Sequence, residues 1–117
     1  MPGYEIREYV TAEGRSPFDA WLRGLKDVRG RAWVRAQLDR VNLGDYAPVG
    51  AGVFELRLHF GPGYRVYFGM EAGANVSLLL GGTENTQRRD IFTAKVFWAD
   101  YRKRRNGDQQ AISRQPD

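Results

Sequence analysis

Two runs of alternating apolar and polar residues dominate the hydrophobic pattern of this chain. They cover positions 53–60 and 64–70, and the turn residues Gly61-Pro62-Gly63 separate them. Proline fixes its φ angle and glycine tolerates positive φ, so this pattern predicts a β-hairpin of two half-buried strands. The polar face of that hairpin carries side chains that suit phosphate contact, base stacking and proton transfer: Glu55, Arg57, His59, Arg65 and Tyr67.

Shorter patterns in the first half of the chain predict one strand and two helices. Apolar and polar residues alternate over 4–10, which indicates a first strand. Ser16 is an N-cap residue followed by proline, and apolar residues then recur at helical spacing to about Leu25. Asp27 can cap a second helix that runs to about Asn42. Two helices with so short a connection are expected to form an antiparallel helical hairpin.

The segments that flank the central hairpin predict a loop, a strand and a last helix. Residues 45–52 contain two glycines and a proline, and we expect a loop there. The apolar run 76–80 predicts a buried central strand, which the glycine pair 81–82 should end. Asn85 or Thr86 can cap a last helix. The polar residues 106–117 are expected to be a disordered tail.

The predicted elements follow the order β-α-α-β-β-β-α, which belongs to the α+β class. We therefore predict a small four-stranded, mostly antiparallel sheet with an N-terminal helical hairpin and a C-terminal helix. A chain of 117 residues fits one domain, and we assign residues 1–105 to it. Residues 106–117 then form the tail.

Composition removes several kinds of chemistry from consideration. The chain has no cysteine and one histidine, so disulfides and thiolate metal sites are excluded, and we expect no metal and no cofactor. No apolar run approaches the roughly 18 residues of a membrane span. The first residues also lack the basic and apolar regions of a secretory signal. We therefore expect a cytoplasmic protein without a membrane partner.

The charge of the chain is basic and unevenly placed. The formal charge is +4, and residues 84–105 hold seven Arg and Lys residues against three acidic ones. Such an excess favours a polyanionic partner, chiefly nucleic acid. It also fits an acidic protein partner or a surface charge that only keeps the protein soluble.

Three segments of the chain together resemble the RelE/ParE superfamily of toxins. They are the Phe54–Arg57 strand, the Gly63–Phe68 strand and the strand-to-helix junction Leu79–Ala94. Within the superfamily, the chain is most similar to the HigB-like branch, which includes phage addiction module killer proteins. The resemblance covers residues 4–102 and includes the order of the elements.

This resemblance implies a RelE-like fold and the toxin role in a type II toxin–antitoxin system. RelE-like and HigB-like members are mRNA interferases that cleave mRNA on the ribosome without a metal. A cognate antitoxin, often of the helix-turn-helix type in the HigB branch, neutralises them. In ParE-like members the same fold poisons DNA gyrase instead. The alternatives are therefore a gyrase poison or a degenerate toxin that only binds its antitoxin.

Metal-free RNA cleavage uses the 2′-OH of the RNA as nucleophile, so the protein must orient it, stabilise the phosphate charge and move protons. Arg65 matches the arginine that RelE-like enzymes carry on this strand, and Arg57 stands where the family often has a basic residue. Each is a candidate for phosphate stabilisation or a solvated surface residue. His59 could transfer protons or lie on the rim. Tyr67 could stack on a base or only cover the sheet.

The start of the last helix supplies a second set of candidates. Backbone N–H groups at a helix start favour a phosphate, which makes Gln87, Arg88 and Arg89 candidate RNA contacts. The family commonly has a lysine shortly before this point, where this chain has Glu84 and Asn85. A carboxylate there repels phosphate, and it is either a general base or an exposed turn residue.

Overall fold

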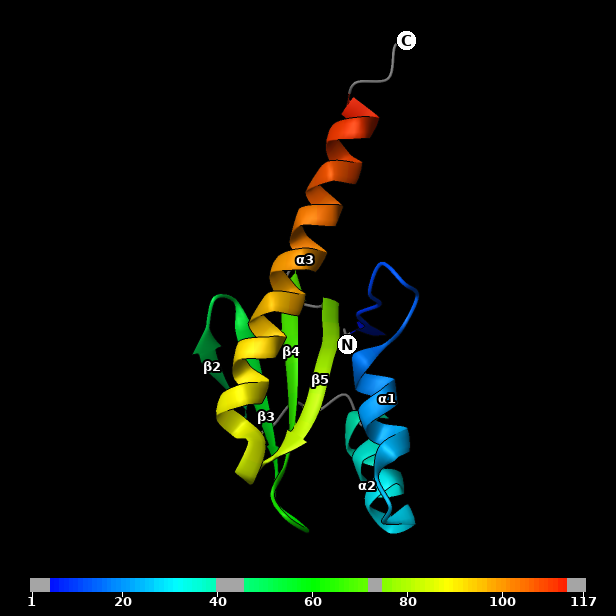
Figure 1. Ribbon diagram of the computed structural model, residues 1–117, viewed down its shortest axis with the longest axis vertical. Helices are drawn as coiled ribbons and strands as arrows, with labels where there is room; N and C mark the ends of the chain where they lie inside the picture. The colour runs from blue at the N-terminus through cyan, green and yellow to red at the C-terminus, as the bar shows by residue number, and fades with distance from the viewer. Residues whose placement is uncertain (1–4, 40–45, 72–74, 114–117) are drawn as a thin grey trace.

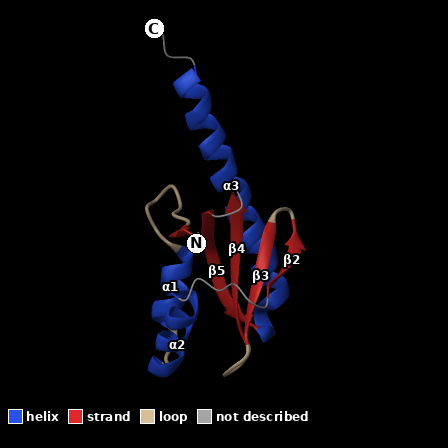
Figure 2. Ribbon diagram, turned by 180° about the vertical axis from the view of Figure 1, so that it is seen from behind, coloured by secondary structure: helices blue, strands red, loops and turns tan. Residues whose placement is uncertain are grey.

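The computed structural model describes residues 5–39, 46–71 and 75–113 as a three-layer α/β arrangement (Figure 1). A five-stranded sheet in the order β1-β5-β4-β3-β2 forms the middle layer. The elements are β1 Glu5–Glu8, α1 Pro17–Gly24, α2 Val28–Asp39, β2 Tyr46–Gly50, β3 Val53–Leu58, β4 Tyr64–Glu71, β5 Asn75–Thr83, the 3₁₀ turn η1 Glu84–Thr86 and α3 Gln87–Ser113. Seen from behind, the sheet lies in front of α3 (Figure 2).

The predicted central hairpin is confirmed. Strands β3 and β4 pair antiparallel, with Arg57 opposite Arg65. The turn closes through a hydrogen bond from the Gly63 N–H to the Phe60 carbonyl oxygen at 3.2 Å. Gly61 and Gly63 have φ angles of 58° and 78°, which explains why glycine stands at both positions. The turn thus fixes the register that puts the two arginines side by side.

The predicted four-stranded sheet is wrong, because the segment assigned to a loop contains a fifth strand. Strand β2 pairs antiparallel with β3 at the sheet edge. An edge strand needs hydrogen bonds on one side only, so it tolerates Pro48, which reads as a loop signal in the sequence. The ring of Tyr46 packs against Phe54 and Phe68, with centroid distances of 5.7 Å to each.

The predictions of a mostly antiparallel sheet and an N-terminal helical hairpin also need correction. Strand β1 pairs parallel with β5, so the sheet is mixed. Helix α1 makes its close backbone contacts chiefly with β5 rather than with α2. Ser16 caps α1 by accepting the Asp19 N–H, and Asp27 caps α2 by accepting the Arg29 N–H, as predicted. The caps mark where helices begin, but they carry no information on what each helix packs against.

The glycine pair 81–82 does not end its strand, because β5 continues to Thr83. A side chain at Gly81 would collide with the ring of Trp21, and one at Gly82 would collide with the Asp90 carboxylate. The two glycines therefore allow α1 and α3 to approach opposite faces of one strand. Residues 106–113, predicted as part of a disordered tail, continue α3, and 114–117 lie outside the described residues.

Two apolar clusters hold the layers together. The cluster between the sheet and the first two helices has a fully buried centre, formed by Phe18, Val34, Val66 and Phe68. The cluster under α3 contains Tyr9, Val53, Tyr67, Leu79, Ala94 and Trp98. Because successive side chains of a strand point to opposite faces, each strand contributes residues to both clusters. The face under α3 also carries the polar side chains of the central hairpin. Among the described residues, no helix is both long and apolar enough to span a membrane.

Replacing Gly69 by Ala should destabilise the protein by about 1–3 kcal/mol, the usual cost of overpacking a core. The indole ring of Trp98 lies where a Gly69 side chain would have to be. Gly24 is the matched control, since an added methyl group there meets no atom within 4 Å. Urea unfolding of the two alanine variants measures the difference, and equal midpoints would contradict this packing.

Candidate active site

A buried carboxylate, Glu55, stands at the centre of the polar side chains on the α3 face of the sheet. Its side chain is only 1% exposed. The Oε1 atom accepts hydrogen bonds from Arg57 Nε at 3.3 Å and Arg65 Nη1 at 3.2 Å. The Oε2 atom accepts from the Tyr67 hydroxyl at 3.1 Å and from Gln87 Nε2 at 2.8 Å. One carboxylate therefore collects four donors from three elements.

The strand register brings these groups together. Glu55 pairs with Tyr67, and Arg57 pairs with Arg65 two residues closer to the turn. Successive side chains alternate between faces, so all four point to the same side of the sheet. Gln87 arrives from the first residue of α3. This convergence requires both the hairpin and the packing of α3 on the sheet.

The start of α3 is fixed by its own hydrogen bonds. The Thr86 hydroxyl accepts the Thr83 N–H at 3.1 Å and donates to the Asp90 carboxylate. These contacts join the end of β5 to the first turn of α3, with η1 between them. The Gln87 side chain is thereby held over the sheet at the height of Glu55.

The partners of Glu55 decide its charge. Burial raises the pKa of Glu55, but hydrogen bonds from Gln87, Arg57 and Tyr67 together with the charge of Arg65 outweigh it, and the pKa is lowered. Burial and the nearby Glu55 carboxylate raise the pKa of Tyr67 above its ordinary value. The carboxylate is therefore ionised and the phenol protonated at neutral pH. Glu55 thus acts as a fixed anion that holds its donors.

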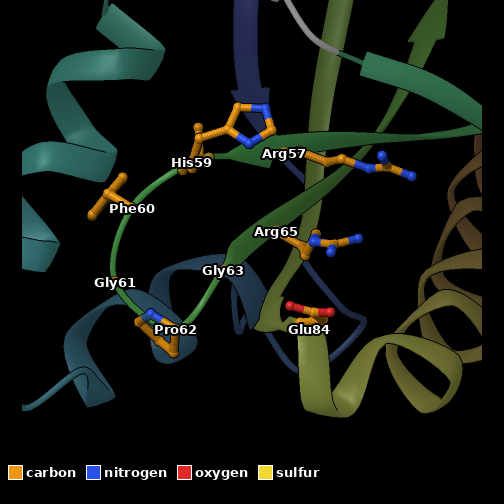
Figure 3. Close-up of a pocket in the computed structure, with 9 residues that line it drawn as sticks. Arg57, His59, Phe60, Gly61, Pro62, Gly63, Arg65 and Glu84 are labelled. Carbon is orange, nitrogen blue, oxygen red and sulfur yellow. The ribbon is translucent and has the colours of Figure 1, made fainter.

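An open hollow of about 610 Å³ lies beside this network. Its lining comes from the end of β3, the turn, the start of β4 and the first residue after β5: Arg57, Leu58, His59, Phe60, Gly61, Pro62, Gly63, Arg65 and Glu84. Figure 3 shows the side chains of Arg57 and Arg65 extending side by side from neighbouring strands, with the Glu84 carboxylate near Arg65. The Arg57 side chain is 50% exposed and that of Arg65 is 12% exposed.

The structure separates the predicted site residues into three groups. Arg57, Arg65 and His59 line the hollow. Tyr67 and Gln87 both donate hydrogen bonds to Glu55, so they hold the carboxylate that orients the arginines. Tyr67 is fully buried and therefore has no exposed ring face on which a base could stack. The remaining two, Arg88 and Arg89, are exposed on α3 and do not line the hollow.

The sequence analysis placed Glu55 on the polar face of the hairpin but gave it no role in the site. The alternating pattern places it on the same face as Arg57, but alternation does not tell which part of a polar face a helix covers. A carboxylate two residues before Arg57, on the strand face that also carries Arg65, is the signal that could have identified it. A buried charge is expensive unless it is paired, so such a residue predicts a built network.

The arrangement can bind an anion in the hollow. Each arginine donates one N–H to Glu55. A guanidinium has five N–H donors in total, so both arginines retain donors for a ligand. Because both guanidinium groups are hydrogen-bonded to the same fixed carboxylate, they are already oriented before a ligand binds. The described residues contain no group of three His, Asp or Glu side chains that could hold a metal ion.

A relative with no stated activity matches this chain. A Haemophilus influenzae protein named "Uncharacterized protein" is 45% identical over 83 residues, which are 68% of this chain and 84% of the relative. No family model matches the chain. The name of this relative states no activity or substrate.

Proposed function

We propose that this chain, which belongs to the same protein family as the uncharacterized Haemophilus influenzae relative, is the toxin of a type II toxin–antitoxin system. It acts as a metal-independent mRNA interferase that cleaves mRNA on the ribosome. The single observation that supports this activity most is the Arg57–Arg65 pair, oriented by a buried carboxylate at the edge of an open hollow. The similarity of the chain to RelE-like and HigB-like toxins supports the toxin role.

In this proposal the RNA supplies its own nucleophile. The 2′-OH loses its proton and attacks the adjacent phosphate, the P–O5′ bond breaks, and the leaving O5′ takes up a proton. Negative charge grows on the phosphate oxygens during this step. Arg65 and Arg57 stabilise that charge, because a guanidinium is permanently charged and matches phosphate oxygens in pairs. Glu55, with Tyr67 and Gln87 behind it, keeps Arg65 in place. Oriented donors of this kind lower the barrier because they need no reorganisation during the reaction.

The proposed partners follow from the same reading. The toxin works in the cytoplasm on ribosome-bound mRNA, and a cognate antitoxin of the helix-turn-helix type holds it inactive. The exposed basic residues Arg102, Lys103, Arg104 and Arg105 on α3 support a polyanionic partner such as the ribosome.

One observation favours a second candidate, a gyrase-poisoning toxin or a degenerate toxin that only binds its antitoxin. Glu84 brings a negative charge to the hollow, next to the proposed phosphate position. In a pure phosphate site this charge would weaken binding by repulsion. The alternative therefore depends on whether the Glu84 carboxylate prevents a phosphate from binding in the hollow.

A reconstituted translation reaction tests the proposed function. We expect the purified protein, free of antitoxin, to cut mRNA within translated codons and to leave the same mRNA intact when ribosomes are omitted. A parallel gyrase supercoiling assay should be unaffected. Intact mRNA together with inhibited supercoiling would overturn the proposal in favour of the gyrase poison.

A further inference from the structure

A row of aromatic rings leads from the core to the surface beside the hollow. Trp21 contacts Tyr64 with a ring-centroid distance of 6.0 Å, and Tyr64 contacts Phe60 at 5.1 Å. Phe60 contacts Trp33 at 5.2 Å, with the two ring planes 81° apart. Edge-to-face pairs at these distances are favourable contacts, so each ring supports the next. The row ends at Trp33, which is 45% exposed.

The packing of α2 fixes the position of Trp33. Val34 and Leu38 on the same helix are buried in the cluster between the sheet and the first two helices. On the turn before Val34, a Cβ atom at Gly30 would come within 2.9 Å of the Tyr64 hydroxyl oxygen. The helix is therefore held close to the aromatic row. The Trp33 ring contacts Phe60 while almost half of the residue remains in contact with water.

The aromatic row and the arginine pair meet at the same hollow. Phe60 lines the hollow together with Arg57 and Arg65. Figure 3 shows the Phe60 side chain on the α2 side of the turn, while the two arginine side chains extend to the other side. A strand of RNA with a phosphate on the arginines can therefore pass around the turn and bring a base to Trp33.

The surroundings of Trp33 suit a nucleic acid strand. Proteins that bind single-stranded nucleic acid combine cationic side chains for the backbone with aromatic rings on which bases stack. Arg29 is exposed one helical turn before Trp33, on the same side of α2. Residues 28–38 contain no acidic side chain. This part of the surface thus favours a polyanion, and Trp33 offers apolar ring surface to the bases of that polyanion.

From this arrangement, and resting on the proposed function, we propose that Trp33 and Phe60 form a nucleobase subsite for the single-stranded RNA that the protein cleaves. Trp33 stacks on a base, and Phe60 supports the Trp33 ring. Arg57 and Arg65 hold a phosphate of the same strand. The stacking contact takes no part in bond breaking, so Trp33 is a binding residue. Every base has a π-face, so the subsite adds affinity with little sequence preference.

Binding of short single-stranded RNA tests the subsite without requiring cleavage. The two probes are 2′-O-methyl oligoadenylate and a 2′-O-methyl abasic chain of the same length and charge, which cannot be cleaved because neither has a free 2′-OH. Wild type should bind oligoadenylate about 5- to 100-fold more tightly than the abasic chain, the usual effect of one base–aromatic stack. Trp33→Leu should lose most of this preference and bind the abasic chain as wild type does.

Two further variants control for the ring and for the helix. Trp33→Phe should keep most of the preference for oligoadenylate, because a phenyl ring still stacks on a base. Val28→Ala shortens another exposed apolar side chain of α2 and should match wild type with both probes. Unchanged affinity of Trp33→Leu for the abasic chain shows that the variant is folded.

The outcomes separate the subsite from the nuclease activity. If Trp33→Leu prefers oligoadenylate as strongly as wild type does, the subsite is wrong, even if translated mRNA is cleaved. If wild type binds both probes equally, Trp33 serves another contact, such as a protein partner, and the proposal is overturned. If the preference depends on Trp33 but translated mRNA stays intact, the subsite stands and the proposed nuclease function fails.

Discussion

Replacing Glu55 by Ala should lower the free energy of unfolding by about 3 kcal/mol. Removing one partner of a buried ion pair typically costs about 3–5 kcal/mol, because the other charges lose their compensation. We expect the lower end because Arg57 is half exposed and can turn toward water. Arg65 and the Tyr67 hydroxyl remain largely buried and cannot.

Urea unfolding at neutral pH measures this loss. The control is Glu13→Ala, which removes an exposed glutamate and should change stability by no more than about 0.5 kcal/mol. Equal stabilities for the two variants would show that the Glu55 network does not hold the structure together.

The same residue should give the protein an acid-sensitive stability. The pKa of Glu55 is lowered from 4.5 in the folded state, so the native protein holds this proton less tightly than the unfolded chain. Its contribution is therefore fully present above pH 4.5 and is lost as the pH falls through the lowered folded value. Unfolding measured from neutral to acid pH should show a shallower loss for Glu55→Gln than for wild type. Parallel curves would contradict the role of Glu55 as an ionised anchor.

Replacing Arg65 by Ala should slow mRNA cleavage by about 10²–10³-fold, the loss usually seen when one donor to a developing oxyanion is removed. Arg65 is held on Glu55 by one N–H and is the less exposed of the two arginines, so it offers its remaining donors in a fixed orientation. Arg65→Lys should restore little, because an ammonium group cannot bind Glu55 and a phosphate as a planar fork.

Single-turnover cleavage on stalled ribosomes measures this effect. Arg35→Ala removes an exposed arginine from α2, away from the hollow, and should leave the rate unchanged. A wild-type rate for Arg65→Ala would remove the phosphate role from this residue. Urea unfolding of the same variant separates lost chemistry from lost structure.

The sequence was sufficient to predict the elements whose signals are local. The alternation on either side of Gly61-Pro62-Gly63 identifies β3 and β4, and it places Arg57 and Arg65 on one face. The Ser16 and Asp27 caps identify where two helices begin, because a cap depends only on its neighbours in the chain.

The parts that were missed depend on contacts between distant segments. Strand β2 is too short and too irregular to show an alternation of apolar and polar residues. Pro48 argues against a strand unless it is known that β2 lies at the sheet edge. The parallel pairing of β1 with β5 has no local signal. The importance of Glu55 likewise appears only when Gln87, 32 positions along the chain, is brought over it.

Mapping mRNA 5′ ends after induced expression tests the central claim most directly, with wild type beside Arg65→Ala. The account predicts growth arrest and new 5′ ends inside translated reading frames for the wild type, and neither for the variant. Arrest without new 5′ ends, or the same ends in the Arg65→Ala strain, would contradict it.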